Sequence, residues 1–96
     1  MTGASVFSFR LYVAGEGQNS TRAIANLNAL CQARLAGRHE IEVIDVFGEP
    51  QRALADGIVM TPTLMRMEPG PVRRVIGTLQ EMDHVATALG LAGADR

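Results

Sequence analysis

The sequence contains no lysine and only one cysteine. Its nine basic residues are all arginines, and ten acidic residues bring the net charge to −1. A chain with this balance has no electrostatic attraction for nucleic acid or for an anionic membrane surface, so neither is an expected partner. The lone cysteine excludes an internal disulfide, and it excludes thiol–disulfide exchange by a cysteine pair.

Long apolar runs and clusters of metal ligands are also missing. No run approaches the roughly 18 apolar residues that a membrane-spanning helix requires, and residues 1–5 lack the basic stretch that begins a secretory signal. The only histidines, His39 and His84, lie in different predicted elements, and no carboxylates cluster with them at the spacing of metal ligands. We therefore expect no metal and no cofactor. We expect a single cytoplasmic domain over residues 1–96.

The first half of the chain predicts a strand, a helix and a second strand. Residues 7–14 are apolar, aromatic and β-branched, as in a central strand. Asn19 or Ser20 would cap a helix, which Gly37 would end at the C′ position. The near-continuous apolar character of residues 41–47 is typical of a parallel strand that is covered on both faces.

The second half predicts a short helix, a hairpin and a last helix. Pro50 suits the first position of a helix over residues 50–56, with Ala53 and Leu54 facing inward and Gly57 ending it. Residues 63–67 and 72–76 predict the two strands of the hairpin. A capping box at 78–81 and an apolar stripe behind it predict the last helix; the stripe comprises Leu79, Met82, Val85, Ala86 and Leu89. The resulting order, β-α-β-α-β-β-α, predicts an α/β fold with a four-stranded mixed sheet and helices on both faces.

The segment Thr61-Pro62-Thr63 precedes a predicted strand in the way that thioredoxin-like domains enter their third strand. In those domains the peptide bond before the proline is cis, and we expect the same at Pro62. In their redox members the proline faces a Cys-x-x-Cys pair, whereas residues 15–20 here contain no cysteine. Cys31 lies on the apolar stripe of the first helix and is predicted to be a core residue. The sequence thus predicts a thioredoxin-like frame without redox chemistry.

Several motifs in register, from residue 11 to about residue 89, resemble the KaiB family. The matching motifs are 11–15 (LYVAG), Asn19-Ser20 with Arg22-Ala23, 43–46 (VIDV) with Pro50-Gln51, 61–64 (TPTL) and 71–77 (PVRRVIG). The resemblance implies a binding protein and not an enzyme. KaiB-like proteins dock on the N-terminal ring of the hexameric ATPase KaiC and help to set its phosphorylation and ATPase state. Where KaiA exists they also sequester it, and a related domain forms the sensor end of the histidine kinase SasA.

The same resemblance implies a KaiC-binding face around the end of the second strand and the short helix after it. On this chain the face comprises Val46, Phe47, Pro50, Gln51, Leu54 and Gly57, with charge around it from Arg22, Arg66 and Arg73 or Arg74. Because Arg73 and Arg74 are successive residues of a strand, they should point to opposite faces of the sheet. The family commonly has lysine where this chain has Gly48 and Gly57.

KaiB proteins also switch fold. Their resting form rebuilds the second half of the chain and assembles into dimers or tetramers, whereas the KaiC-bound form is thioredoxin-like. Such a switch requires two packings within a few kcal/mol of each other. Residues 85–92 are rich in alanine, the best helix former, and poor in β-branched residues. We therefore hypothesise that the thioredoxin-like state is the ground state of this chain.

Two further functions stay open. An interaction module for a different ATPase, or for a sensor histidine kinase, would reuse the same face without redox activity. A glutathione-binding transferase would use the frame around Pro62 to hold an extended peptide backbone. For the transferase, however, the sequence shows no nucleophile and no acid–base pair.

Overall fold

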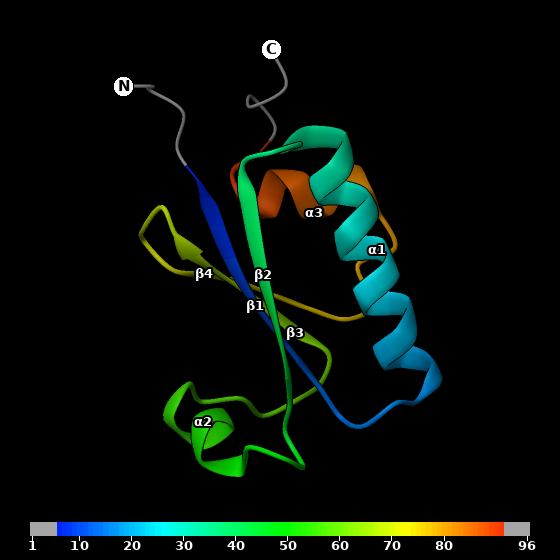
Figure 1. Cartoon of the computed structure of the whole chain (residues 1–96), viewed down its shortest axis with the longest axis vertical. Coiled ribbons are helices and arrows are strands. Elements are labelled where there is room, and N and C mark those ends of the chain that lie inside the picture. The colour runs from blue at the N-terminus through cyan, green and yellow to red at the C-terminus, as the bar shows by residue number, and fades with distance from the viewer. Residues whose placement is uncertain (1–5, 92–96) are drawn as a thin grey trace.

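The computed structural model describes residues 6–91 and shows seven elements in the predicted order (Figure 1). They are β1 (Phe7–Val13), α1 (Gln18–Arg34), β2 (His39–Asp45), α2 (Pro50–Ala55), β3 (Thr63–Glu68), β4 (Arg73–Ile76) and α3 (Met82–Ala88). The prediction for residues 1–5 lies outside the described range. Within that range, no helix has both the length and the apolar content to cross a membrane.

β1 lies inside a four-stranded sheet in the order β2-β1-β3-β4. β2 runs parallel to β1, while β3 is antiparallel to both β1 and β4, so the sheet is mixed as predicted. β2 lies at the edge of the sheet. The expectation that it is covered on both faces is wrong, because Ile44 is its only buried residue and Val43 is 44% exposed. Apolar composition does not reveal which strand has a neighbour on only one side.

The two faces of the sheet carry different layers (Figure 1). α1 and α3 cover one face, the α1/α3 face, and form the main core with it. That core comprises Phe7, Phe9, Leu11, Val13, Ala23, Leu27, Leu30, Cys31, Leu35, Leu64, Leu79, Val85, Ala86, Leu89 and Leu91. The opposite face, the α2 face, carries a smaller cluster of Tyr12, Ile44, Ala53 and Met65. Helices on both faces are confirmed, although α2 lies at one end of its face.

The two ends of α1 differ from the prediction. The helix begins at Gln18 after Gly17 and has no side-chain cap. Ser20 lies inside the first turn, where it is buried and its hydroxyl donates to the carbonyl oxygen of Ala14 at 3.4 Å. The helix ends at Arg34, so Gly37, with φ of +73°, lies in the turn beyond the cap and not at C′. Ser20 therefore lies inside the helix and does not cap it.

The start of α3 also differs from the prediction. The helix begins at Met82 after Glu81, so the capping box at residues 78–81 does not form. Leu79 has φ of +65° and its side chain is buried in the main core. The side-chain amide of Asn26 donates to the carbonyl oxygen of Thr78 at 2.6 Å. These contacts with the core and with α1 hold the segment outside the helix.

The peptide bond before Pro62 is cis, as predicted. The bonds before Pro69 and Pro71 are also cis, which was not predicted.

Candidate docking surface

α2 is a helix of six residues whose ends follow from the sequence. Pro50 occupies the first turn, where its missing N–H costs no helical hydrogen bond. Gly57 follows the helix with φ of +68°, a left-handed conformation that glycine adopts without strain. Ala53 faces inward as predicted, but Leu54 does not, since it is 81% exposed. Successive helical residues point in directions about 100° apart, so the two cannot face the same point of the sheet.

Exposed large apolar side chains occur on α2 and on the connections at its two ends. We define the α2 surface by its exposed residues Phe47, Pro50, Gln51, Leu54, Gly57, Val59 and Met60. Val59, at 92%, is the most exposed large apolar side chain among the described residues. Val59 and Met60 were not predicted, because two adjacent apolar residues show no periodicity that assigns them to a face. Exposed apolar side chains on one short helix and its two connections make this region a candidate interaction surface.

The connection between β2 and α2 presents Phe47 through hydrogen bonds to Asp45. The Oδ1 atom of Asp45 accepts from the N–H groups of Gly15 and Phe47, each at 3.0 Å. The Phe47 ring lies against Gly15, where a Cβ atom would come within 3.6 Å of it. Val46 is partly buried and packs against the smaller cluster. Val46 therefore supports the surface from beneath, while Phe47 forms part of it.

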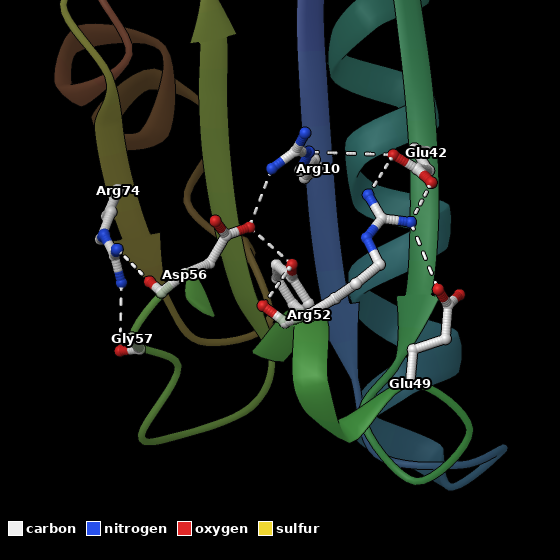
Figure 2. A network of polar contacts seen from close by, with 8 residues as sticks. Arg10, Glu42, Glu49, Arg52, Asp56, Gly57 and Arg74 are labelled. Carbon is white, nitrogen blue, oxygen red and sulfur yellow. Dashed lines mark hydrogen bonds and ion pairs between the residues drawn. The ribbon is translucent and has the colours of Figure 1, made fainter. Parts of the chain in front are cut away.

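Charged side chains lie between α2 and the sheet (Figure 2). The hydroxyl of Tyr12 donates to Oδ2 of Asp56 at 2.5 Å, and the guanidinium of Arg10 donates to the same oxygen at 3.0 Å. Arg52 forms a two-pronged pair with the carboxylate of Glu42, at 2.5 and 2.9 Å. The charged side chains of Arg52 and Asp56 thus make their contacts toward the sheet, while the apolar side chain of Leu54 lies in solvent.

The protonation states of Asp56 and Tyr12 suit an anchor and not an acid–base site. The hydrogen bond from Tyr12 holds the pKa of Asp56 below its usual range, and Arg10 acts in the same direction, against the effect of burial. Burial raises the pKa of Tyr12 to about 12, and the Asp56 carboxylate adds to the rise. Near neutral pH the carboxyl group is ionised and the phenol is neutral. Both pKa values therefore lie away from neutral pH, where general acid–base catalysis is most effective.

The structure places the predicted arginines Arg74, Arg73 and Arg22 at three separate positions. Arg74 lies on the α2 face and donates to the carbonyl oxygens of Asp56 and Gly57, the latter at 3.3 Å, so it contacts the end of α2 itself. Arg73, its neighbour in β4, points to the α1/α3 face, as strand alternation predicts. Arg22 is exposed on α1, the helix that covers that face.

Arg66 does not belong to the α2 surface, and its predicted place there is wrong. It is only 6% exposed, and its guanidinium donates to the carbonyl oxygens of Leu89 at 2.5 Å and Pro71 at 2.8 Å. Side chains alternate along β3, so Met65 lies under α2 while Leu64 and Arg66 lie on the α1/α3 face. Arg66 holds the end of α3 and supplies no surface charge.

A cleft of about 290 Å³ lies beside Pro62, where the redox members of the fold carry their cysteine pair. It is lined by Ala14, Gly17, Gln18, Asn19, Ser20, Thr61 and Pro62. Cys31 lies elsewhere, fully buried in the main core, and burial raises the pKa of its thiol to about 11, so its prediction as a core residue is confirmed. Within residues 6–91, no group of three His, Cys, Asp or Glu side chains is placed to hold a metal ion.

Proteins of similar sequence are KaiB proteins, and proteins of similar structure have the thioredoxin-like fold. The sequence matches the KaiB domain family over residues 10–91. The circadian clock protein KaiB3 of Synechocystis sp. is 39% identical over 82 residues, which cover 85% of this chain and 80% of that protein. The N-terminal domain of Synechococcus elongatus SasA has a TM-score of 0.74 at 22% identity, over 96% of this chain and 87% of that one. Oxidised mitochondrial thioredoxin 3 of Saccharomyces cerevisiae has a TM-score of 0.70 at 16% identity, over 90% of this chain and 78% of that one. These structures confirm the thioredoxin-like fold.

Proposed function

Because this chain belongs to the KaiB family, we propose that it is a regulatory protein that docks through the α2 surface on a KaiC-type ATPase hexamer. It modulates the phosphorylation and ATPase state of that partner in the cytoplasm, and it catalyses no reaction itself. The observation that carries the proposal is the orientation of α2, whose charged side chains face the sheet while Leu54 faces solvent. Apolar area presented in this way stays in water until a partner covers it.

Docking would remove the four large apolar side chains of the α2 surface from water. They are Phe47, Leu54, Val59 and Met60. Full burial of one such side chain contributes about 1.5–3 kcal/mol. Two or three of them at the centre of an interface would therefore supply a large part of the about 8 kcal/mol that micromolar binding requires.

Leu54→Asp is expected to weaken binding to the KaiC-type ATPase at least about 10-fold. The reason is that a carboxylate in the middle of an apolar interface loses its hydration without gaining a partner. Since Leu54 is exposed, the substitution should leave the circular dichroism spectrum and the Tm unchanged. Isothermal titration calorimetry with the purified ATPase hexamer, with and without ATP, measures the affinity.

Val72→Asp is the matched control for this experiment. Val72 is also an exposed apolar residue, but it lies between β3 and β4, at the other end of β3 from the α2 surface. It should bind as the wild type does. Unchanged affinity of Leu54→Asp would mean that docking uses another face, and failure of the wild type to bind with or without ATP would refute the KaiC-type partner. KaiA and a SasA-like histidine kinase, offered in the same assay, test whether the surface serves another clock protein.

We also propose that the thioredoxin-like arrangement is the ground state of the chain. Its support is that residues 85–88 lie in α3, with Val85 and Ala86 in the main core, and that their alanine-rich sequence favours a helix. NMR chemical shifts of the wild type are expected to report a helix over residues 82–88 in the major species. Strand shifts over residues 85–89 would contradict this, and light scattering would detect a dimer or tetramer.

A further inference from the structure

α2 has little stability of its own, and its apolar packing is confined to Ala53 and to the flanking residues Val46 and Ile58. Its six residues fall well short of the about 12–15 at which isolated helices become marginally stable. Ala53 is its only buried side chain, and an alanine methyl group removes little apolar area from water. The position of the helix therefore depends on the polar contacts on its sheet side.

Asp56, the C-cap residue of α2, receives three of these contacts (Figure 2). Its Oδ2 atom accepts hydrogen bonds from Tyr12 and Arg10, both on β1. Its main-chain carbonyl oxygen accepts from Arg74, on β4. In the sheet, β1 and β4 lie on either side of β3. A single residue thus ties the end of α2 to two strands that are not neighbours.

The other tether of α2 is more exposed to solvent. Arg52 and its partner Glu42 on β2 have side chains that are 35% and 51% exposed, whereas the side chain of Asp56 is 18% exposed. Exposed ion pairs contribute little to stability, while hydrogen bonds to a partly buried carboxylate are stronger. Asp56 is therefore the main anchor.

We propose that Asp56 is a positioning residue of the α2 surface: its carboxylate fixes the orientation of α2 and presents Leu54 and Val59 to the partner in a preformed arrangement. The inference rests on the proposed function for the identity of that partner. The carboxylate points toward Tyr12 and Arg10 on the sheet, so it acts through α2 and not by touching the partner. A preformed surface loses less conformational entropy on docking, which raises affinity.

Amide hydrogen exchange of the full-length protein tests the anchoring without a partner. The amides of Ala53, Asp56, Gly57 and Ile58 donate to backbone carbonyls in and beside α2. In Asp56→Ala they are expected to exchange at least about 10-fold faster, while the amides of α1 keep their rates. Asp56→Asn keeps an acceptor oxygen without the charge, so it should restore part of the protection. The control Asp83→Ala removes an exposed carboxylate from α3 and should match the wild type.

Two results of the exchange experiment would overturn the inference. Unchanged rates in α2 of Asp56→Ala would show that the carboxylate does not anchor the helix. Equal acceleration of the α1 and α2 amides would show a global loss of stability in place of local positioning.

Affinity for the ATPase hexamer separates positioning from other roles. Asp56→Ala is expected to weaken binding about 10-fold and Asp56→Asn about 3-fold. In a Leu54→Ala background, Asp56→Ala should cost less affinity than it does alone, because the side chain that it positions is gone. Fully additive losses would contradict positioning. If the wild type forms no complex, the proposed function fails, and the exchange rates still decide whether Asp56 anchors α2.

Discussion

Replacing Leu27 with alanine is expected to lower the free energy of unfolding by about 3 kcal/mol. Leu27 lies on α1 and is fully buried in the main core, so the substitution removes apolar atoms from close packing and leaves a cavity. Alanine has the higher helix propensity, so the loss would come from packing and not from α1 itself. Urea denaturation followed by circular dichroism measures the change, as a shifted midpoint at unchanged m-value.

Leu54→Ala is the matched control, because it removes the same atoms from a helical leucine that is exposed. It is expected to change the free energy of unfolding by less than about 0.5 kcal/mol while weakening docking about 10-fold. Leu27→Ala should show the reverse, with lower stability and near wild-type affinity where it remains folded. Equal losses of stability at the two leucines would show that Leu54 is not a surface residue.

Gly90→Ala is expected to lower the free energy of unfolding by about 2–4 kcal/mol. Gly90 has φ of +77°, a conformation that costs other residues about 1–2 kcal/mol. A Cβ atom there would lie 2.8 Å from Nη1 of Arg66. That guanidinium is buried and donates to the carbonyl oxygens of Leu89 and Pro71, so it cannot move aside without weakening these bonds. Hydrogen bonds of charged groups contribute about 1.5–3 kcal/mol each.

Gly37→Ala separates the backbone cost from the contact with Arg66. Gly37 has φ of +73°, close to that of Gly90, but a Cβ atom there would meet nothing within 4 Å. Gly37→Ala should therefore lower the free energy of unfolding by only about 1 kcal/mol in the same urea denaturation experiment. If Gly90→Ala costs no more than Gly37→Ala, the guanidinium of Arg66 moves aside freely and does not hold the end of α3.

Features that depend on a few adjacent residues could be predicted from the sequence. Pro50 and Gly57 mark the ends of α2, because one lacks an N–H group and the other accepts a positive φ. The place of Cys31 on an apolar stripe predicted its burial, which the structure confirms. The strand and helix periodicities likewise predicted the order of the elements.

Features that depend on distant residues could not be predicted in this way. The helical pattern predicted that Leu54 faces inward, whereas the family resemblance placed it on the binding face. The structure ties Asp56 to Tyr12 and Arg10, which are 44 and 46 positions away in the chain. These contacts lie between α2 and the sheet and leave Leu54 in solvent. Arg66 has the same local pattern as a surface arginine, and only the packing of α3 over β3 buries it.

The sequence by itself determined the family, the order of the elements and the absence of cysteine from residues 15–20, because these depend on residue types and their spacing. Only the tertiary structure decided that β2 lies at an edge, that Leu54 faces solvent and that Arg66 is buried. Each of these depends on which strands and helices lie side by side. Contacts between residues far apart in the chain leave no local pattern, so the orientation of the α2 surface depends on tertiary packing.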